Sequence, residues 1–220
     1  MRGTRGVAAA AGWAMAVAVA GGTAGSAWAE PATYDFADPK GVNGVMFVLD
    51  SELEPFVGIG GGIAGEVTYD PADPSSFGGS ISLDARTLQL VSQGMTDVMF
   101  NADWLNVEDR ATITVTFHDV AEVGVAPHDH HEGEHEHQTV LTVNGTITFG
   151  AISIDKQFQI EPTFVEDGAT NRGAGQGDLL VLRSKFTVNR FDLGIENPAG
   201  VVAPEIHVTV PIVGYEKSGE

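Results

Sequence analysis

The chain of 220 residues contains no cysteine, and this absence excludes several kinds of protein. Without thiols there is no disulfide framework, no cysteine nucleophile and no thiol-linked lipid anchor. Positive charge is also scarce, because 11 Lys and Arg face 30 Asp and Glu, which gives a net charge of −19. This acidic balance disfavours nucleic acid and anionic membrane surfaces as partners.

The sequence also lacks the local motifs of common catalytic sites. It contains no G-x-S-x-G stretch, and its acidic residues are too many and too scattered to nominate a general acid–base pair. The glycine-rich run over 58–62 does not connect a strand to a helix, so it is not a phosphate-binding loop. We therefore predict a protein that is not an enzyme and requires no cofactor.

Long apolar runs are absent except at the N-terminus. A basic leader precedes the apolar run Val7–Ala20, and a small-x-small processing site ends at Ala29. The run is too short to span a bilayer comfortably. These features predict a secretory signal peptide over 1–29 and one exported domain over 30–220, periplasmic or extracellular and without stable membrane insertion. A retained N-terminal anchor is the alternative.

Apolar and polar residues alternate with a period of two along most of the remaining chain. The alternation marks eight segments: 45–49, 62–70, 80–87, 112–118, 139–149, 152–160, 179–188 and 205–213. One apolar and one polar face are typical of antiparallel sheets that are wet on one side. Eight such strands must protect their edges, and closure into a barrel does so. The fold class we predict is all-β, an antiparallel eight-stranded barrel, with a sandwich as the alternative.

Two segments depart from the alternation. Met95, Val98, Met99 and Ala102 recur at helical spacing, which predicts a short helix within 92–106 that packs on the barrel or caps one end. The glycine-rich stretch 166–178 indicates a long, mobile loop.

Five stretches together resemble a known family: YDFADPKGVNGVMF, ISLDART, FNADWLNVEDRATITVTF, LTVNGTITFGAISIDKQFQI and VNRFDLGI. Their order is similar to that of the YceI-like family, secreted bacterial lipocalin-like barrels associated with polyisoprenoid binding. In the most specific stretch, Asn189, Arg190, Asp192 and Gly194 fall on family positions, while Leu193 replaces the usual Phe. Other departures from the family pattern are Lys40, Gly41, Asn106 and Ala111. They mark a divergent member.

The resemblance implies a lipocalin-like barrel that holds a polyisoprenoid or similar long apolar lipid in its interior. If the apolar faces point inward, the candidate lumen residues are Phe47, Leu83, Ile113, Phe117, Leu141, Val143, Phe158, Leu182 and Phe186. From the residues alone, a filled core and a hollow lumen are equally compatible with this pattern. The sequence also leaves open whether the chain forms a homodimer.

Arg190 and Asp192 form a second constellation. Two residues apart in a strand, both side chains would face the same way. An ion pair that closes the barrel end is one interpretation, and contact with a ligand head group is the other.

The segment over 127–138 is rich in histidine. It holds His128, His130, His131, His135 and His137, interleaved with four acidic residues. Imidazole and carboxylate ligands suit Zn²⁺ or Cu²⁺. The spacing does not fit H-E-x-x-H on a helix, so a catalytic metal centre is not indicated. The alternative function is therefore an exported metal-binding or metal-buffering protein, against the simpler interpretation of a solvated loop.

Calorimetric titration tests the histidine-rich segment. If the segment is a metal site, the intact chain binds Zn²⁺ or Cu²⁺ and a variant without residues 128–137 loses that binding, whereas a solvated loop binds neither ion. Binding by the intact chain should weaken below about pH 6, because protonated imidazole is not a ligand. Equal binding by the two forms would eliminate the segment as the site.

Overall fold

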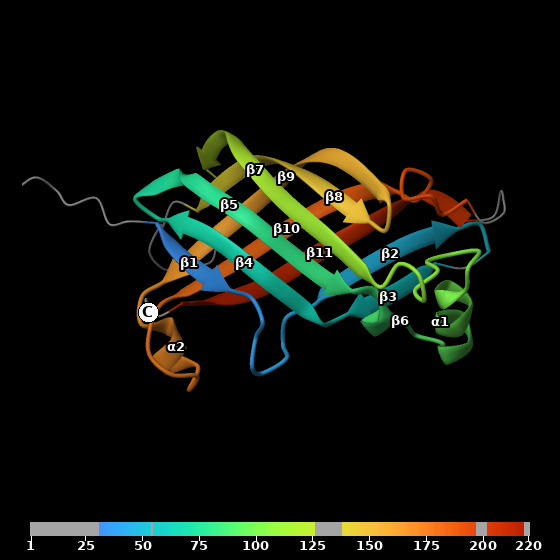
Figure 1. Ribbon diagram of the computed structural model, residues 1–220, viewed down its shortest axis with the longest axis horizontal. Coiled ribbons are helices and arrows are strands. Elements are labelled where there is room, and N and C mark those ends of the chain that lie inside the picture. The colour runs from blue at the N-terminus through green and yellow to red at the C-terminus, as the bar shows by residue number, and fades with distance from the viewer. Residues whose placement is uncertain (1–30, 54, 126–137, 197–201, 218–220) are drawn as a thin grey trace, which may run out of the picture.

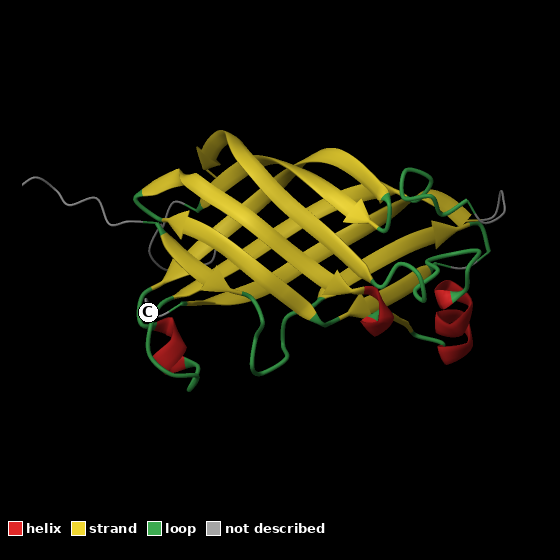
Figure 2. Cartoon of the chain, viewed as in Figure 1, coloured by secondary structure: helices red, strands yellow, loops and turns green. Residues whose placement is uncertain are grey.

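The computed structural model describes residues 31–53, 55–125, 138–196 and 202–217. Within these ranges, long antiparallel strands wrap around one interior, with a small helix at each end (Figure 1 and Figure 2). The predicted signal peptide over 1–29 and the five histidines of the predicted metal site lie outside the described residues.

The elements follow one another along a single sheet. The strands are β1 (Ala32–Asp35), β2 (Val45–Ser51), β3 (Phe56–Gly60), β4 (Ile63–Asp70), β5 (Asp73–Asp84), β6 (Gln89–Leu90), β7 (Thr112–Val125), β8 (Thr139–Phe149), β9 (Ile152–Val165), β10 (Leu179–Asn189) and β11 (Val202–Glu216). The helical elements are the 3-10 turn η1 (Ala85–Thr87), α1 (Gln93–Phe100) and α2 (Gly168–Asn171).

Eight of the strands form a closed ring. They follow the order β1-β4-β5-β7-β8-β9-β10-β11, and β11 pairs with β1 to close it. Each pairing in the ring is antiparallel. The predicted eight-stranded antiparallel barrel is therefore confirmed. Closure of the ring gives every ring strand a hydrogen-bonded neighbour on both sides, so no strand edge is left open.

The remaining strands, β2, β3 and β6, extend the barrel wall at the other end of β11. β1 pairs with Tyr215 and Glu216, whereas β2 pairs with β11 between Val202 and Thr209. β3 then pairs with β2, and β6 with β3. Alternation does not reveal β3, because two of its three inward positions, Gly58 and Gly60, carry no apolar side chain, and only Phe56 does.

The predicted helix within 92–106 is confirmed as α1, which ends at Phe100 and continues as hydrogen-bonded turns. The predicted mobile loop over 166–178 instead contains α2 and is tied to the β1–β2 connection. There the Arg172 guanidinium lies 3.5 Å from the buried carboxylate of Asp38, which also accepts a hydrogen bond from the Tyr215 hydroxyl at 3.1 Å. Within the described part of the chain, no helix is both long and apolar enough to cross a membrane.

Two glycines set the close approach of β4 and β5 beside β1. Gly65 and Gly79 have φ values of +127° and +130°, which favour glycine. A Cβ on Gly65 would lie 2.2 Å from the Ser80 carbonyl oxygen, and one on Gly79 would lie 2.2 Å from that of Glu66. Neither distance is compatible with a side chain, so the tight twist of this pair requires glycine at both positions.

A matched pair of substitutions tests this requirement. We expect Gly79→Ala to lower the free energy of unfolding by about 2–4 kcal/mol, because it adds backbone strain and a clash with the main chain. Gly78→Ala is the control, since a Cβ there meets no atom within 4 Å. Urea denaturation followed by circular dichroism measures both. Equal destabilisation by the two variants would contradict the argument.

Candidate ligand-binding site

A row of five aromatic rings crosses the barrel interior. Tyr69, Phe77, Phe117, Phe158 and Phe186 contact one another in sequence, with centroid separations of 6.2, 5.2, 5.8 and 5.2 Å. Every contact is edge-to-face, the geometry that aromatic quadrupoles favour. We call this set the aromatic row.

The interior next to β1 is densely packed. Tyr34, Phe36 and Leu180 have at most 1% of their surface exposed, and Phe77 of the aromatic row has 2%. No lining residue of the cavity described below comes from β1. This part of the barrel is a filled core.

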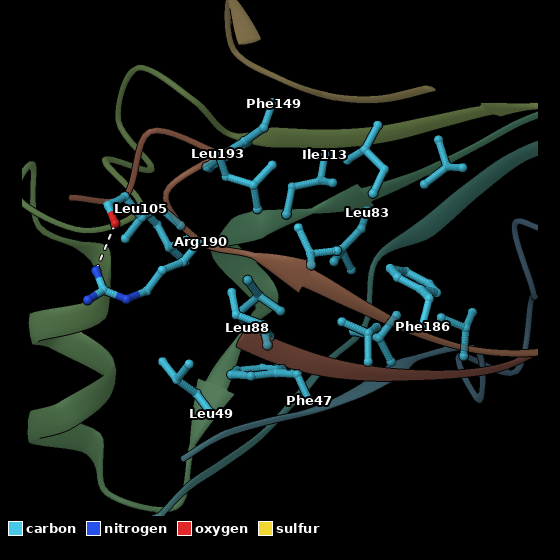
Figure 3. A pocket seen from close by; sticks show the side chains of 18 of the residues that line it. Phe47, Leu49, Leu83, Leu88, Leu105, Ile113, Phe149, Phe186, Arg190 and Leu193 are labelled. Carbon is cyan, nitrogen blue, oxygen red and sulfur yellow. Dashed lines mark hydrogen bonds between the residues drawn. The ribbon is translucent and has the colours of Figure 1, made fainter. Parts of the chain in front are cut away.

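The interior on the side of α1 is hollow. A cavity of about 240 Å³ lies there, and its lining side chains are apolar apart from Ser82, Ser184 and Arg190 (Figure 3). Phe117, Phe158 and Phe186 of the aromatic row line it, whereas Tyr69 and Phe77 do not. The row therefore lies where the filled core gives way to the cavity, and Ile160 and Leu182 continue the cavity lining a short way beyond it.

Inward side chains that border the cavity are less buried than those of the filled core. Phe47, Leu83 and Ile113 face the interior but are only partly buried, because they border the cavity. An apolar cavity of about 150 Å³ accommodates benzene, so one of 240 Å³ has room for on the order of ten carbon atoms, or two isoprene units.

The predicted lumen residues separate into two groups. Seven line the cavity: Phe47, Leu83, Ile113, Phe117, Phe158, Leu182 and Phe186. Leu141 and Val143 do not, and both are 0% exposed in the filled core. The prediction for these two is corrected. They follow the same alternation as the others, but close packing leaves no free space beside them.

Helix α1 lies beside the open end of the cavity. Met95, Val98 and Met99 contribute to the lining, and Val98 is also 44% exposed, so the cavity comes closest to solvent here. The buried Thr96 hydroxyl accepts a hydrogen bond from the Leu90 N–H at 2.9 Å, which ties the helix to β6. We call this end of the cavity the mouth.

Arg190 lies at the edge of the cavity, and its guanidinium points away from Phe186 (Figure 3). It is 1% exposed and donates to the carbonyl oxygens of Ile195 at 2.8 Å, Ala203 at 3.2 Å and Val202 at 3.4 Å. These bonds hold the β10–β11 connection against the barrel. Arg190 is thus a structural donor to main-chain carbonyls.

The predicted relation between Arg190 and Asp192 is wrong. β10 ends at Asn189, and the next residues form a turn rather than a strand. Asp192 is exposed and does not line the cavity. The ion pairs within the described residues do not include one between these two side chains.

Arg110 has a similar role that the sequence did not reveal. Its guanidinium donates to the carbonyl oxygens of Trp104 at 3.0 Å, Leu105 at 3.1 Å and Leu193 at 2.9 Å, and lies 4.3 Å from the ring centre of Phe149. It joins the segment after α1 to the turn after β10. Its only sequence signal is a single basic residue just before a strand, which a solvated arginine would share.

The two histidines in the described residues do not form a metal site. His118 contacts the Thr146 hydroxyl, and His207 contacts that of Thr187, on different strands. No group of three or more metal-ligating side chains occurs within the described ranges. Metal binding by the histidine-rich segment stays a prediction.

Comparison with known proteins identifies the family. The YceI-like domain model matches residues 45–213. The chain belongs to the YceI-like domain family. The resemblance of its sequence motifs is thereby confirmed, although none of the curated proteins matches the chain.

Solved structures share the YceI-like barrel at low sequence identity. BcnA of Burkholderia cenocepacia is 15% identical, with a TM-score of 0.57 over 78% of this chain and 95% of that one. A Campylobacter jejuni YceI protein is 14% identical, with a TM-score of 0.56 over 73% and 85% of the two chains. A polyisoprenoid binding domain from Saccharophagus degradans, implicated in plant cell wall breakdown, is 10% identical, with a TM-score of 0.58 over 85% and 99%. At these identities the likeness concerns the fold alone.

Removal of Arg110 tests how the mouth of this YceI-like domain is held. We expect Arg110→Met to lower the free energy of unfolding by about 2–4 kcal/mol, because three partly buried carbonyls lose their donor. Arg86→Met is the control, since Arg86 pairs with Asp84 at the surface and is itself 64% exposed. Urea denaturation should show a clear loss for the first variant and almost none for the second. Similar losses would contradict the role of Arg110.

Proposed function

We propose that the chain is an exported binding protein that holds a polyisoprenoid or a similar long apolar lipid in the hollow half of the barrel. The observation that carries this proposal is the apolar cavity of about 240 Å³ between the aromatic row and α1. Apolar cavities of this kind stay dry and bind apolar molecules. Export rests on the N-terminal leader in the sequence.

The comparisons support the same class of ligand. The chain belongs to the YceI-like domain family, and a protein that shares its fold is described as a polyisoprenoid binding domain. The cavity lining offers two serine hydroxyls and one guanidinium among many apolar side chains, a composition suited to holding a ligand rather than transforming it. We therefore propose a binding function without catalysis.

The cavity volume limits how much of the ligand is enclosed. Burial contributes about 0.8 kcal/mol per CH₂, so each five-carbon isoprene unit adds roughly 3 kcal/mol or more before ordering costs. Since about two units fit, two units supply most of the binding energy. A longer chain extends through the mouth beside Val98.

A series of prenols tests the proposal. We expect affinity, measured by native mass spectrometry and by tryptophan emission from Trp104 in the cavity wall, to rise at least tenfold from the five-carbon to the ten-carbon alcohol. It should change little for longer chains, because the added carbons lie outside the cavity. Failure of every chain length to bind would overturn the proposal.

A variant that fills the cavity provides the control. Val115 lines the cavity, so Val115→Trp should occupy it and weaken prenol binding at least tenfold. Thr112→Trp places the same ring at an exposed position of the same strand and should leave binding unchanged. Equal effects of both substitutions would show that the binding site lies elsewhere.

A further inference from the structure

The polar end of a bound lipid has one place to lie. The filled core next to β1 closes the far end of the cavity, so an apolar chain enters from the mouth and keeps its polar end there. The chemistry of the mouth therefore decides which head groups the protein accepts. This reasoning rests on the proposed function and adds the class of head group to it.

Every polar side chain that lines the cavity within the described residues already donates to a main-chain carbonyl. The Ser184 hydroxyl donates to the Gln159 carbonyl at 2.7 Å, and the Ser82 hydroxyl donates to the Ala64 carbonyl at 3.2 Å. The Arg190 guanidinium donates to three carbonyls in the same way. An anion needs donors to replace its water shell, and these donors are occupied.

The charge around Arg190 does not favour an anion either. A hollow of about 440 Å³ adjoins the cavity edge, and Arg190 lines both. The ionisable side chains of this hollow, besides Arg190, are the carboxylates of Asp50 and Glu52. None of the other Lys and Arg residues in the described ranges lines the cavity or the hollow. In the sequence, residues 54 and 197–201, which the structure does not describe, include no Lys, Arg or His.

We propose that the cavity is selective for lipids with an uncharged polar end, such as a prenol, and against lipids that end in phosphate or carboxylate. A hydroxyl head group carries no charge, so it needs no cationic partner and the carboxylates of Asp50 and Glu52 do not repel it. A diphosphate of the same chain loses hydration, finds its donors engaged and faces Asp50 and Glu52. The chain is the same in both ligands, so the head group alone makes the difference.

Binding of three ligands with one chain tests this selectivity. Farnesol, farnesoic acid and farnesyl diphosphate are titrated against the protein, with tryptophan emission and native mass spectrometry as readouts. We expect farnesol to bind at least tenfold more tightly than either anion. Equal or tighter binding of an anion would overturn the selectivity and leave the proposed function intact. Failure of all three to bind would overturn the proposed function itself.

Charge reversal in the hollow beside Arg190 tests whether its carboxylates cause the preference for an uncharged head group. Asp50→Lys together with Glu52→Lys should raise the affinity for farnesyl diphosphate at least tenfold and change that for farnesol less than twofold. Glu122→Lys together with Glu166→Lys gives the same net charge, from exposed positions on β7 and next to α2. This control should leave the preference for farnesol nearly unchanged. The same gain in affinity for farnesyl diphosphate in both double variants would show that overall charge, and not the hollow beside Arg190, sets the preference.

Discussion

The aromatic row is the constraint on which the rest of the site depends. Tyr69, Phe77, Phe117, Phe158 and Phe186 contact one another edge to face along the interior of strands β4, β5, β7, β9 and β10. On the β1 side of the row the interior is densely packed, which stabilises the closed sheet. On the other side space remains for a ligand. In the function that we propose, the filled core on the β1 side of the row limits how much of a lipid chain the cavity encloses.

The irregular backbone near the mouth requires hydrogen-bond donors for its carbonyl oxygens, which is a second constraint on the site. The connections after α1 and after β10 leave carbonyl oxygens without partners in the sheet, and buried carbonyls require donors. Arg110 and Arg190 supply them, each to three carbonyls. The two guanidinium groups thus hold the mouth in shape. Since the same donors are then engaged, the interactions that build the mouth are also the basis of the head-group preference that we propose.

The sequence predicted the elements whose side chains alternate over many residues, and it failed where alternation is short or interrupted. Seven of the eight ring strands were recognisable, and so was β2 outside the ring. The eighth ring strand, β1, has only four residues, and β3 has glycine at two of its three inward positions. Asp192 was misplaced because a turn after Asn189 was interpreted as a continuing strand. Leu141 and Phe117 have the same inward phase, so only packing distinguishes a core side chain from a cavity wall.

The sequence alone determined the barrel class, the family and the inward face of the strands that alternate over many residues, because side-chain periodicity and family motifs are local properties of the chain. Tertiary structure decided which inward residues border free space, because that depends on side chains from strands far apart in sequence. It also decided the role of the arginines. A guanidinium can bind a ligand or a carbonyl, and only the folded backbone shows that carbonyls of Trp104, Leu193 and Ile195 lie within reach.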